Sequence, residues 1–351
     1  MTQDTMESSA ETAAVSNFLR QHSKWSYLEV GFWVVACASW FVLPDRHLIL
    51  TEIVIFAILA LSIDLVLGYG GIVTLGQAAM YGMGAYASGL FSIHVTGEPL
   101  IGLLVAACAG AAIALPTSFL LLRGTDLTRL MVTLGVAAVL HELANQMKWL
   151  TGGADGLQGI SIKPLFNAFE FDIYGHTGYA YSLTVMFVLF VVARYVVASP
   201  FGYSLKAIRD NSLRASAIGI PVKPRLVAIY TLSGAYAGIA GALFTQTQQF
   251  ISLDALAFQK SADGLMVLVI GGSGYLYGGI LGALFYEFIQ DALSSLTPQY
   301  WQFWLGFLLV VFVIVGRDRP RQMVQAMTER LSGKTRHAPV NPSVEQRGKA
   351  S

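Results

Sequence analysis

The sequence predicts an all-α fold, a polytopic transmembrane helical bundle of about ten spans. Its 351 residues are 55% hydrophobic and only 12% charged, which is about half the charged fraction of a soluble domain. Apolar runs of about 20 residues recur along the chain, and a helix of that length crosses a bilayer. The 35 glycines agree with this, because small residues let membrane helices approach closely. The formal net charge of +1 gives no reason to expect a nucleic-acid partner.

Ten apolar segments account for the expected spans. They are residues 28–43, 48–67, 72–92, 100–122, 127–147, 180–198, 226–249, 259–276, 277–294 and 300–316. The third is the least regular, since the stretch 68–84 carries six glycines that could mark a broken or re-entrant helix instead of a clean crossing. No small-residue cleavage site follows the polar start of the chain, so no cleavable signal peptide is expected.

The positions of Lys and Arg predict the orientation, because basic loops stay in the cytoplasm. Basic residues gather at the connection 123–129, in the loop 201–225 and after residue 316. Ten crossings place all three on one side, so both termini are expected in the cytoplasm and the 148–179 loop outside. The expected domains are a polar tail (1–24), a transmembrane domain (25–316) that includes the cytoplasmic loop 199–225, and a basic tail (317–351).

The loop 201–225 is a polar island between two apolar runs, and we expect it to hold a short helix. Asp210 or Asn211 can cap a helix that begins near Ser212. Gly219 suits the left-handed position after a helix end, and a proline two residues later prevents continuation. About two helical turns remain between these signals.

This short helix has the features of a docking element. Leu213 and Ala217 share a face, and Ala215 adds little bulk, so a partner surface could come close to the backbone. Arg209 and Arg214 could pair with acidic residues of that partner. The alternative is an ordinary basic loop that obeys the positive-inside rule. Spacing alone does not decide between the two.

Polar residues inside the expected spans are candidates for a solute pathway. Asp64 lies near the inner end of the second span, and His141, Glu142 and Asn145 lie in the fifth. A charge at the bilayer centre costs at least roughly 2.5–3.5 kcal/mol, so such residues are expected to face the bundle interior, a wet cavity or the interface. The alternative is hydrogen bonding between helices or placement near a membrane surface, and it is favoured for Glu287 and Asp291, which lie close to a span end.

No residue pattern indicates an enzyme. The polar trio of the fifth span lacks a second cluster at ligand spacing, and no nucleophile is evident, so no metal, cofactor or catalytic site is expected. The stretch Gly271-Gly272-Ser273-Gly274 is not followed by the Gly-Lys-Ser/Thr of a P-loop, so the chain is not expected to hydrolyse ATP. Cys37 and Cys108 fall inside expected spans, which argues against a disulfide.

Several segments together resemble the permease subunits of branched-chain amino-acid ABC importers. The matching segments are Arg209-Asp210-Asn211 with Ala215, Ala217, Gly219 and Ile220, the glycine-rich run 68–86, and the runs 150–157, 237–243 and 270–283. They follow the family's order from about residue 48 to 316. Each motif is weak alone, whereas their joint order is specific. The length and the single long inner loop look most like the LivM-type subunit of the pair.

The resemblance implies that the chain forms half of a heterodimeric pore in the bacterial inner membrane. A second permease subunit would form the other half, two cytoplasmic ABC ATPase subunits would drive transport, and an extracytoplasmic binding protein would deliver substrate. The helix near 212–218 would be the coupling helix, which sits in a groove of one ATPase. The residues expected to couple are Arg209, Asp210, Asn211, Leu213, Arg214, Ala215, Ala217 and Gly219.

The sequence departs from the family pattern at three positions. Ser216 stands where relatives often carry Glu, which alters how the loop would pair with its ATPase. Gln77 stands where many relatives have His, and Asp64 replaces a frequent Asn. Both of these changes bear on the pathway. The residues expected to line it are Asp64, Gln77, His141, Glu142 and Asn145.

Other functions compete with an importer of branched-chain or related amino acids. A related importer could carry urea, amides or aromatic acids, because specificity lies largely in the separate binding protein. A stand-alone secondary transporter would need an ion relay and broken helices near mid-membrane, for which Asp64, Glu142 and the 68–84 glycines are candidates. Nothing in the sequence favours a non-transporting scaffold.

Overall fold

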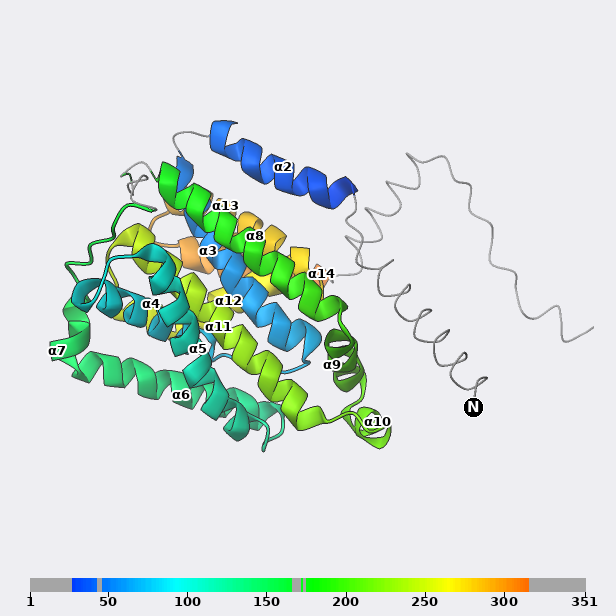
Figure 1. Cartoon of the computed structure of the whole chain (residues 1–351). Helices are drawn as coiled ribbons and strands as arrows, with labels where there is room; N and C mark the ends of the chain where they lie inside the picture. The colour runs from blue at the N-terminus through cyan, green and yellow to red at the C-terminus, as the bar shows by residue number, and fades with distance from the viewer. Residues whose placement is uncertain (1–26, 43–45, 166–171, 173–174, 316–351) are drawn as a thin grey trace, which may run out of the picture. The chain divides into compact units, whose positions relative to one another are not determined.

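The regular elements of the structure, a computed structural model, are helices in the part of the chain that it describes (Figure 1). The described residues are 27–42, 46–165, 172 and 175–315. This part of the chain contains thirteen α-helices and no β-strand, and an isolated bridge joins Leu157 to Ile251. The predicted all-α fold is therefore confirmed. The two expected tails lie outside the described residues.

The chain divides into two units, Met1–Ala292 and Leu293–Ser351, and each is described by itself. The second contains the last turn of α13 and α14 (Trp301–Val315). The helices of the first are α2 (Tyr27–Val42), α3 (His47–Asp64), α4 (Gln77–His94), α5 (Pro99–Leu121), α6 (Asp126–Gln146), α7 (Lys148–Thr151), α8 (His176–Ala198), α9 (Pro200–Asp210), α10 (Ser212–Ala217), α11 (Val222–Gln248), α12 (Phe258–Gly271) and most of α13 (Leu276–Leu296).

Among the described residues, five helices are long and apolar enough to cross a bilayer. They are α3 with its continuation to Tyr69, α5, α6, α8 and α11. A sixth span results if α12 and α13, which are bent by 111° across a short break, are taken together. A polytopic protein is thus confirmed, but the expectation of about ten spans is not. One reason is length: α2 and α12 have 16 and 14 residues, about 24 and 21 Å of helix against a hydrocarbon core of about 30 Å.

The glycine-rich segment after α3 interrupts the helix. The chain continues from α3 as one π-helical turn, η2 (Leu65–Tyr69). Gly71 then adopts a φ of 68°, which glycine reaches without steric strain, and the chain stays non-helical until α4 begins at Gln77. The expected span 72–92 therefore starts later than predicted. Its first turn, from Gln77 to Met80, is buried inside the protein.

Close packing around α11 forms the centre of the first unit. Helix α11 lies against α4 and α5, and α3 lies against α8 and α11. A Cβ on Gly234 would lie 2.8 Å from the carbonyl oxygen of Gly110, and one on Gly238 would lie 3.3 Å from the Cα of Gly110. The Gly234-x-x-x-Gly238 spacing therefore brings α11 and α5 together within this chain.

Candidate functional site

The polar loop between α8 and α11 holds two helices, where the sequence suggested one. Helix α9 begins after Ser199, whose side chain accepts a hydrogen bond from the Gly202 backbone N–H at 3.4 Å. Helix α10 begins after Asn211, whose Oδ1 accepts from the Arg214 N–H at 2.9 Å. Of the two expected caps, Asn211 is the one used, and Asp210 is the last residue of α9.

Helix α10 and the residue that follows it turn one small side chain toward the protein and two large apolar side chains away from it. Ala215 is 2% exposed, whereas Leu213 is 83% and Ile218 is 71% exposed. Arg214 and Ala217 are exposed as well. After the helix, Gly219 has a φ of 88°, as expected for the left-handed position. The outward surface is therefore apolar near the start of α10, at Leu213, and just past its end, at Ile218. No local sequence signal marks Ile218 as a contact residue.

Arg209 connects this loop to the bundle. Its guanidinium Nη1 donates to the carbonyl oxygen of Gly68 in η2, and its Nη2 lies 3.5 Å from the carboxylate of Asp210. A Cβ on Gly71 would lie 2.8 Å from the Cγ of Arg209, so the stem of the arginine packs on glycine. The structure thus directs Arg209 toward its own chain.

Asp64 lies next to the contact between Arg209 and Gly68 and is fully buried. Its Oδ1 accepts from the backbone N–H of Gly274 at 2.6 Å, in the turn between α12 and α13. A Cβ on Gly68 would lie 2.5 Å from the nitrogen of Gly274, and one on Gly274 would lie 3.2 Å from Nη1 of Arg209. Four residues, Asp64, Gly68, Arg209 and Gly274, therefore join α3, α9 and the α12–α13 turn. We call this group the junction.

Gln77 lies at the buried start of α4 among hydroxyl side chains. Its Nε2 donates to Ser233 Oγ at 3.0 Å, and its Oε1 accepts from Ser62 Oγ at 3.2 Å. The next backbone N–H, that of Ala78, donates to Ser261 Oγ at 2.8 Å. These bonds link α3, α4, α11 and α12 at the centre of the unit, and the bond to Ser261 satisfies one backbone N–H in the first turn of α4.

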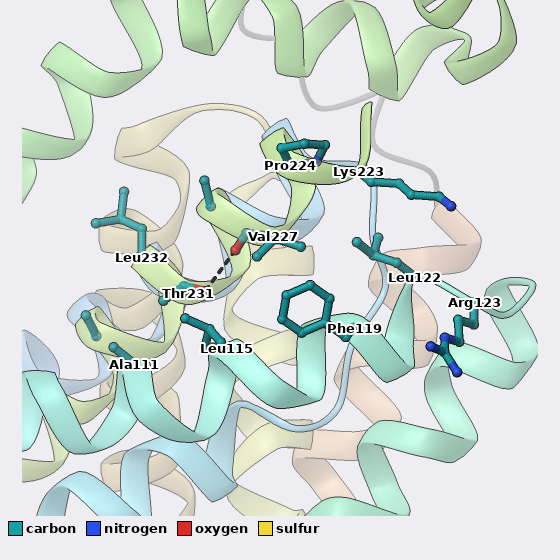
Figure 2. A pocket seen from close by; sticks show the side chains of 12 residues that line it. Ala111, Leu115, Phe119, Leu122, Arg123, Lys223, Pro224, Val227, Thr231 and Leu232 are labelled. Atoms are coloured by element: carbon teal, nitrogen blue, oxygen red, sulfur yellow. Dashed lines mark hydrogen bonds between the residues drawn. The ribbon is translucent and has the colours of Figure 1, made fainter. Parts of the chain in front are cut away.

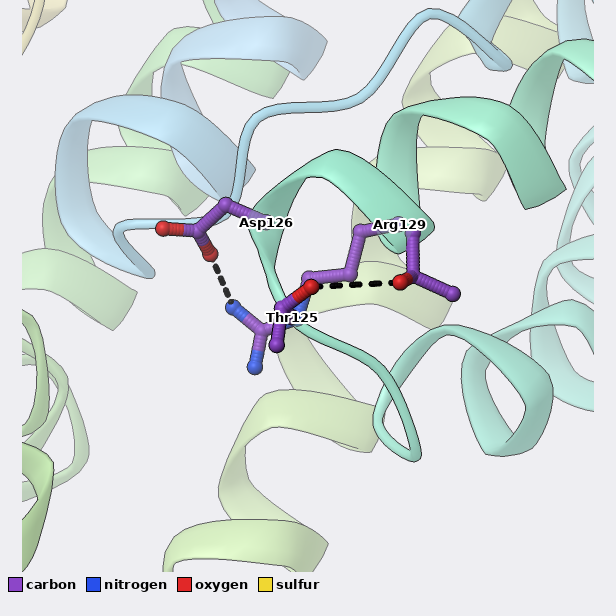
Figure 3. A network of polar contacts seen from close by, with 4 residues as sticks. Thr125, Asp126 and Arg129 are labelled. Carbon is purple, nitrogen blue, oxygen red and sulfur yellow. Dashed lines mark hydrogen bonds and ion pairs between the residues drawn. The ribbon is translucent and has the colours of Figure 1, made fainter.

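The other expected pathway residues lie elsewhere, on α6. His141 and Asn145 are partly exposed and Glu142 is exposed, with its Oε1 accepting from Gln146 Nε2 at 2.9 Å. The structure therefore does not bring them to Asp64 or Gln77. At the start of the same helix, Asp126 and Arg129 form an ion pair at 2.8 Å (Figure 3).

A groove of about 1130 Å³ runs between α5 and α11 (Figure 2). Its lining is mostly aliphatic, with Phe119 on α5 and Val227 on α11. Arg123, just after α5, and Lys223, in the first turn of α11, also line it. The basic residues of two different connections thus lie at one end of the bundle.

These features define a helical membrane protein of several spans, in which a polar loop with its own short helices is joined to a buried turn. The family described as branched-chain amino acid transport system / permease component matches residues 47–315. The chain belongs to this family of permease components. The predicted resemblance is thereby confirmed.

Individual relatives agree with the family. The high-affinity branched-chain amino acid transport system permease protein LivM of Escherichia coli (strain K12) is 30% identical, covering 80% of this chain and 71% of the relative. LivM of Salmonella typhimurium (strain LT2) is 31% identical, covering 76% and 67%. The autoinducer 2 import system permease protein LsrC of Photorhabdus laumondii is 28% identical, covering 80% and 84%. No solved structure matches the chain.

Proposed function

We propose that this chain is the permease subunit of an ATP-driven importer for branched-chain or related amino acids. It forms half of the translocation pathway beside a second permease subunit, receives solute from an extracytoplasmic binding protein, and contacts a cytoplasmic ATPase through α10. The family supports the permease role, and the LivM relatives support the substrate class.

The observation that carries this proposal is the shape of α10. Leu213 and Ile218 are large, apolar and directed away from the rest of the chain. Two large apolar side chains this exposed within one short polar loop suit a surface that a partner protein covers. Arg209, just before α10, contacts η2 through Gly68, so movement of a partner held on α10 would be passed to α3.

The proposed orientation places the α9–α10 loop and both termini in the cytoplasm. The common position of Arg123 and Lys223 at one end of the α5–α11 groove supports it, because basic connections gather on the cytoplasmic side.

The lever role of α10 is tested by replacing Ala217, which is exposed on this helix, with arginine. In the reconstituted importer we expect Ala217→Arg to lower uptake at least about tenfold, because the bulk holds the partner groove away from α10. Insertion and basal ATP hydrolysis persist. Ala154→Arg, an equal change at an exposed residue of the expected outer loop, leaves uptake unchanged. Normal uptake by Ala217→Arg would show that α10 is not the lever.

A solute outside the amino acids is the second candidate, because LsrC relatives are named for autoinducer 2 import. Ligand binding by the cognate extracytoplasmic receptor separates the two. A stand-alone carrier is disfavoured by the position of its expected relay residues, since Asp64 bonds to Gly274 while Glu142 is exposed on α6. Uptake without any ATPase subunit would reverse that conclusion.

A further inference from the structure

A small polar cavity of about 170 Å³ lies between α3, α11, α12 and α13. We call it the chamber. Its lining includes Glu52, Phe56, Phe244, Lys260, Glu287 and Gln290. Pockets for drug-sized ligands measure about 300–1,000 Å³, so the chamber accommodates only a small solute. None of these residues belongs to the expected pathway set or to the junction.

Glu287 is the lining residue that a ligand in the chamber would stabilise most. It is 4% exposed, and within the described part of the chain it has no hydrogen-bond or ion-pair partner. The next acid on the helix, Asp291, instead lies 3.5 Å from Arg46. A buried carboxylate without a partner is costly, above all inside a membrane protein. A cation in the chamber would stabilise Glu287.

The other charges of the chamber are held apart from Glu287. Glu52 Oε1 accepts from Gln248 Nε2 at 3.1 Å, which leaves its second oxygen available. Lys260 Nζ lies 4.8 Å from the centre of the Phe56 ring, a cation–π contact. Among the described residues, no carboxylate oxygen lies within 4.0 Å of this ammonium group. The chamber thus holds two carboxylates and one ammonium group that form no ion pair with one another.

We propose that the chamber binds a zwitterionic α-amino acid with a small apolar side chain, a proposal that rests on the permease function above. Glu287 and Glu52 receive the ammonium group, Lys260 receives the carboxylate, and Phe56 and Phe244 contact the side chain. A zwitterion adds no net charge to the site, so it enters a low-dielectric region at lower cost than a free cation or anion of the same size.

The test uses the complete importer, with its second permease subunit and ATPase subunits, in lipid nanodiscs. Radiolabelled L-leucine is the probe, and leucinamide and 4-methylpentanoate, which lack the carboxylate and the ammonium group respectively, are the competitors. We expect wild type to prefer leucine at least about tenfold over either competitor, since each loses charge-assisted hydrogen bonds. Lys260→Met removes the preference over leucinamide, and Glu287→Gln removes the preference over 4-methylpentanoate.

Asp291→Asn is the matched control, because this acid lies on the same helix and pairs with Arg46. It is expected to bind leucine as wild type does. Unchanged preferences in Lys260→Met and Glu287→Gln, equal loss in Asp291→Asn, or binding of urea or methylamine in place of leucine would each overturn the chamber proposal. If those results accompany ATPase-dependent uptake, the permease function stands without the chamber. Uptake that needs no ATPase would instead remove the function itself.

Discussion

Arg209 and its neighbours at the junction show how little a residue's type reveals about its direction. The sequence indicates a basic side chain on a polar loop, and a cytoplasmic partner was the natural expectation for it. In the structure its guanidinium donates to the Gly68 carbonyl oxygen. Sequence spacing could not predict this contact, because Gly68 lies in another helix and the two approach only through tertiary packing.

Arg209→Ala is therefore expected to destabilise the permease itself. Loss of a hydrogen bond from a charged donor costs about 1.5–3 kcal/mol when the contact is shielded, and less here because the side chain is 40% exposed. We expect a lower melting temperature for the purified permease in detergent. Arg214→Ala, at an exposed position on α10, leaves the melting temperature unchanged. Equal melting temperatures for the two variants would contradict the internal role of Arg209.

Gly68→Ala tests the closeness of the same junction. The added Cβ would lie 2.5 Å from the nitrogen of Gly274 and 2.9 Å from the Cγ of Asp64. Such overpacking typically costs about 1–3 kcal/mol. Gly135→Ala on α6 is the control, since nothing lies within 4 Å of its added Cβ and alanine favours helix. The melting temperature should fall for the first variant and hold or rise for the second.

Among the helices, α10 is the one that local sequence signals predict most completely. A cap before Ser212, a left-handed Gly219 and the small Ala215 were all expected, and the structure has each of them. These are local signals, carried by side chains within a few residues of the bonds they make. Helix α9 was missed, although Ser199 and Pro200 are a typical cap and first residue.

Removal of the α10 cap is expected to weaken coupling by destabilising the helix itself. Asn211→Ala leaves the Arg214 N–H without its side-chain acceptor and costs about 1 kcal/mol of helix stability. Uptake per ATP hydrolysed should fall. Asn211→Ser supplies another capping oxygen and should restore it. If the serine variant is as defective as the alanine variant, the asparagine acts through a direct contact with its partner instead of through the cap.

The breaks in the bundle were less accessible to sequence reasoning. Glycines in 68–84 suggested an interrupted helix, and the interruption is present before Gln77. The bend of 111° between α12 and α13 was read as two ordinary spans, 259–276 and 277–294. Hydropathy cannot detect such a bend, because both arms are apolar. What holds the turn is Asp64, more than 200 residues earlier in the chain.

For the protein as a whole, the family and the helical class could be predicted, whereas the chamber could not. The sequence does not mark Glu52 or Lys260, and it favours bonding between helices or a place near the membrane surface for Glu287. The role of these three residues depends on four helices that pack around one cavity. Short-range patterns in the sequence carry no information about such long-range packing.

The proposed orientation can be measured by cysteine labelling in spheroplasts and inverted membrane vesicles. The chain has two cysteines, both exposed and unbonded in the structure, Cys37 and Cys108. After both are replaced by serine, Leu213→Cys should react with an impermeant maleimide only in inverted vesicles, and Asp155→Cys only in intact spheroplasts. Both reporters are at exposed positions. Labelling of Leu213→Cys from outside would refute the inward position of α10.

The bend between α12 and α13 has one mechanical consequence. Lys260 lies twelve residues before Gly272, and Glu287 lies twelve residues after Tyr275, so each is about 18 Å along its helix from the hinge. Turning one arm by about 10° would move its far end by about 3 Å, roughly the length of a hydrogen bond. Asp64 and Arg209 contact the hinge region. A small movement at that end would therefore change the distance between the oppositely charged Lys260 and Glu287 at the far ends of the two arms.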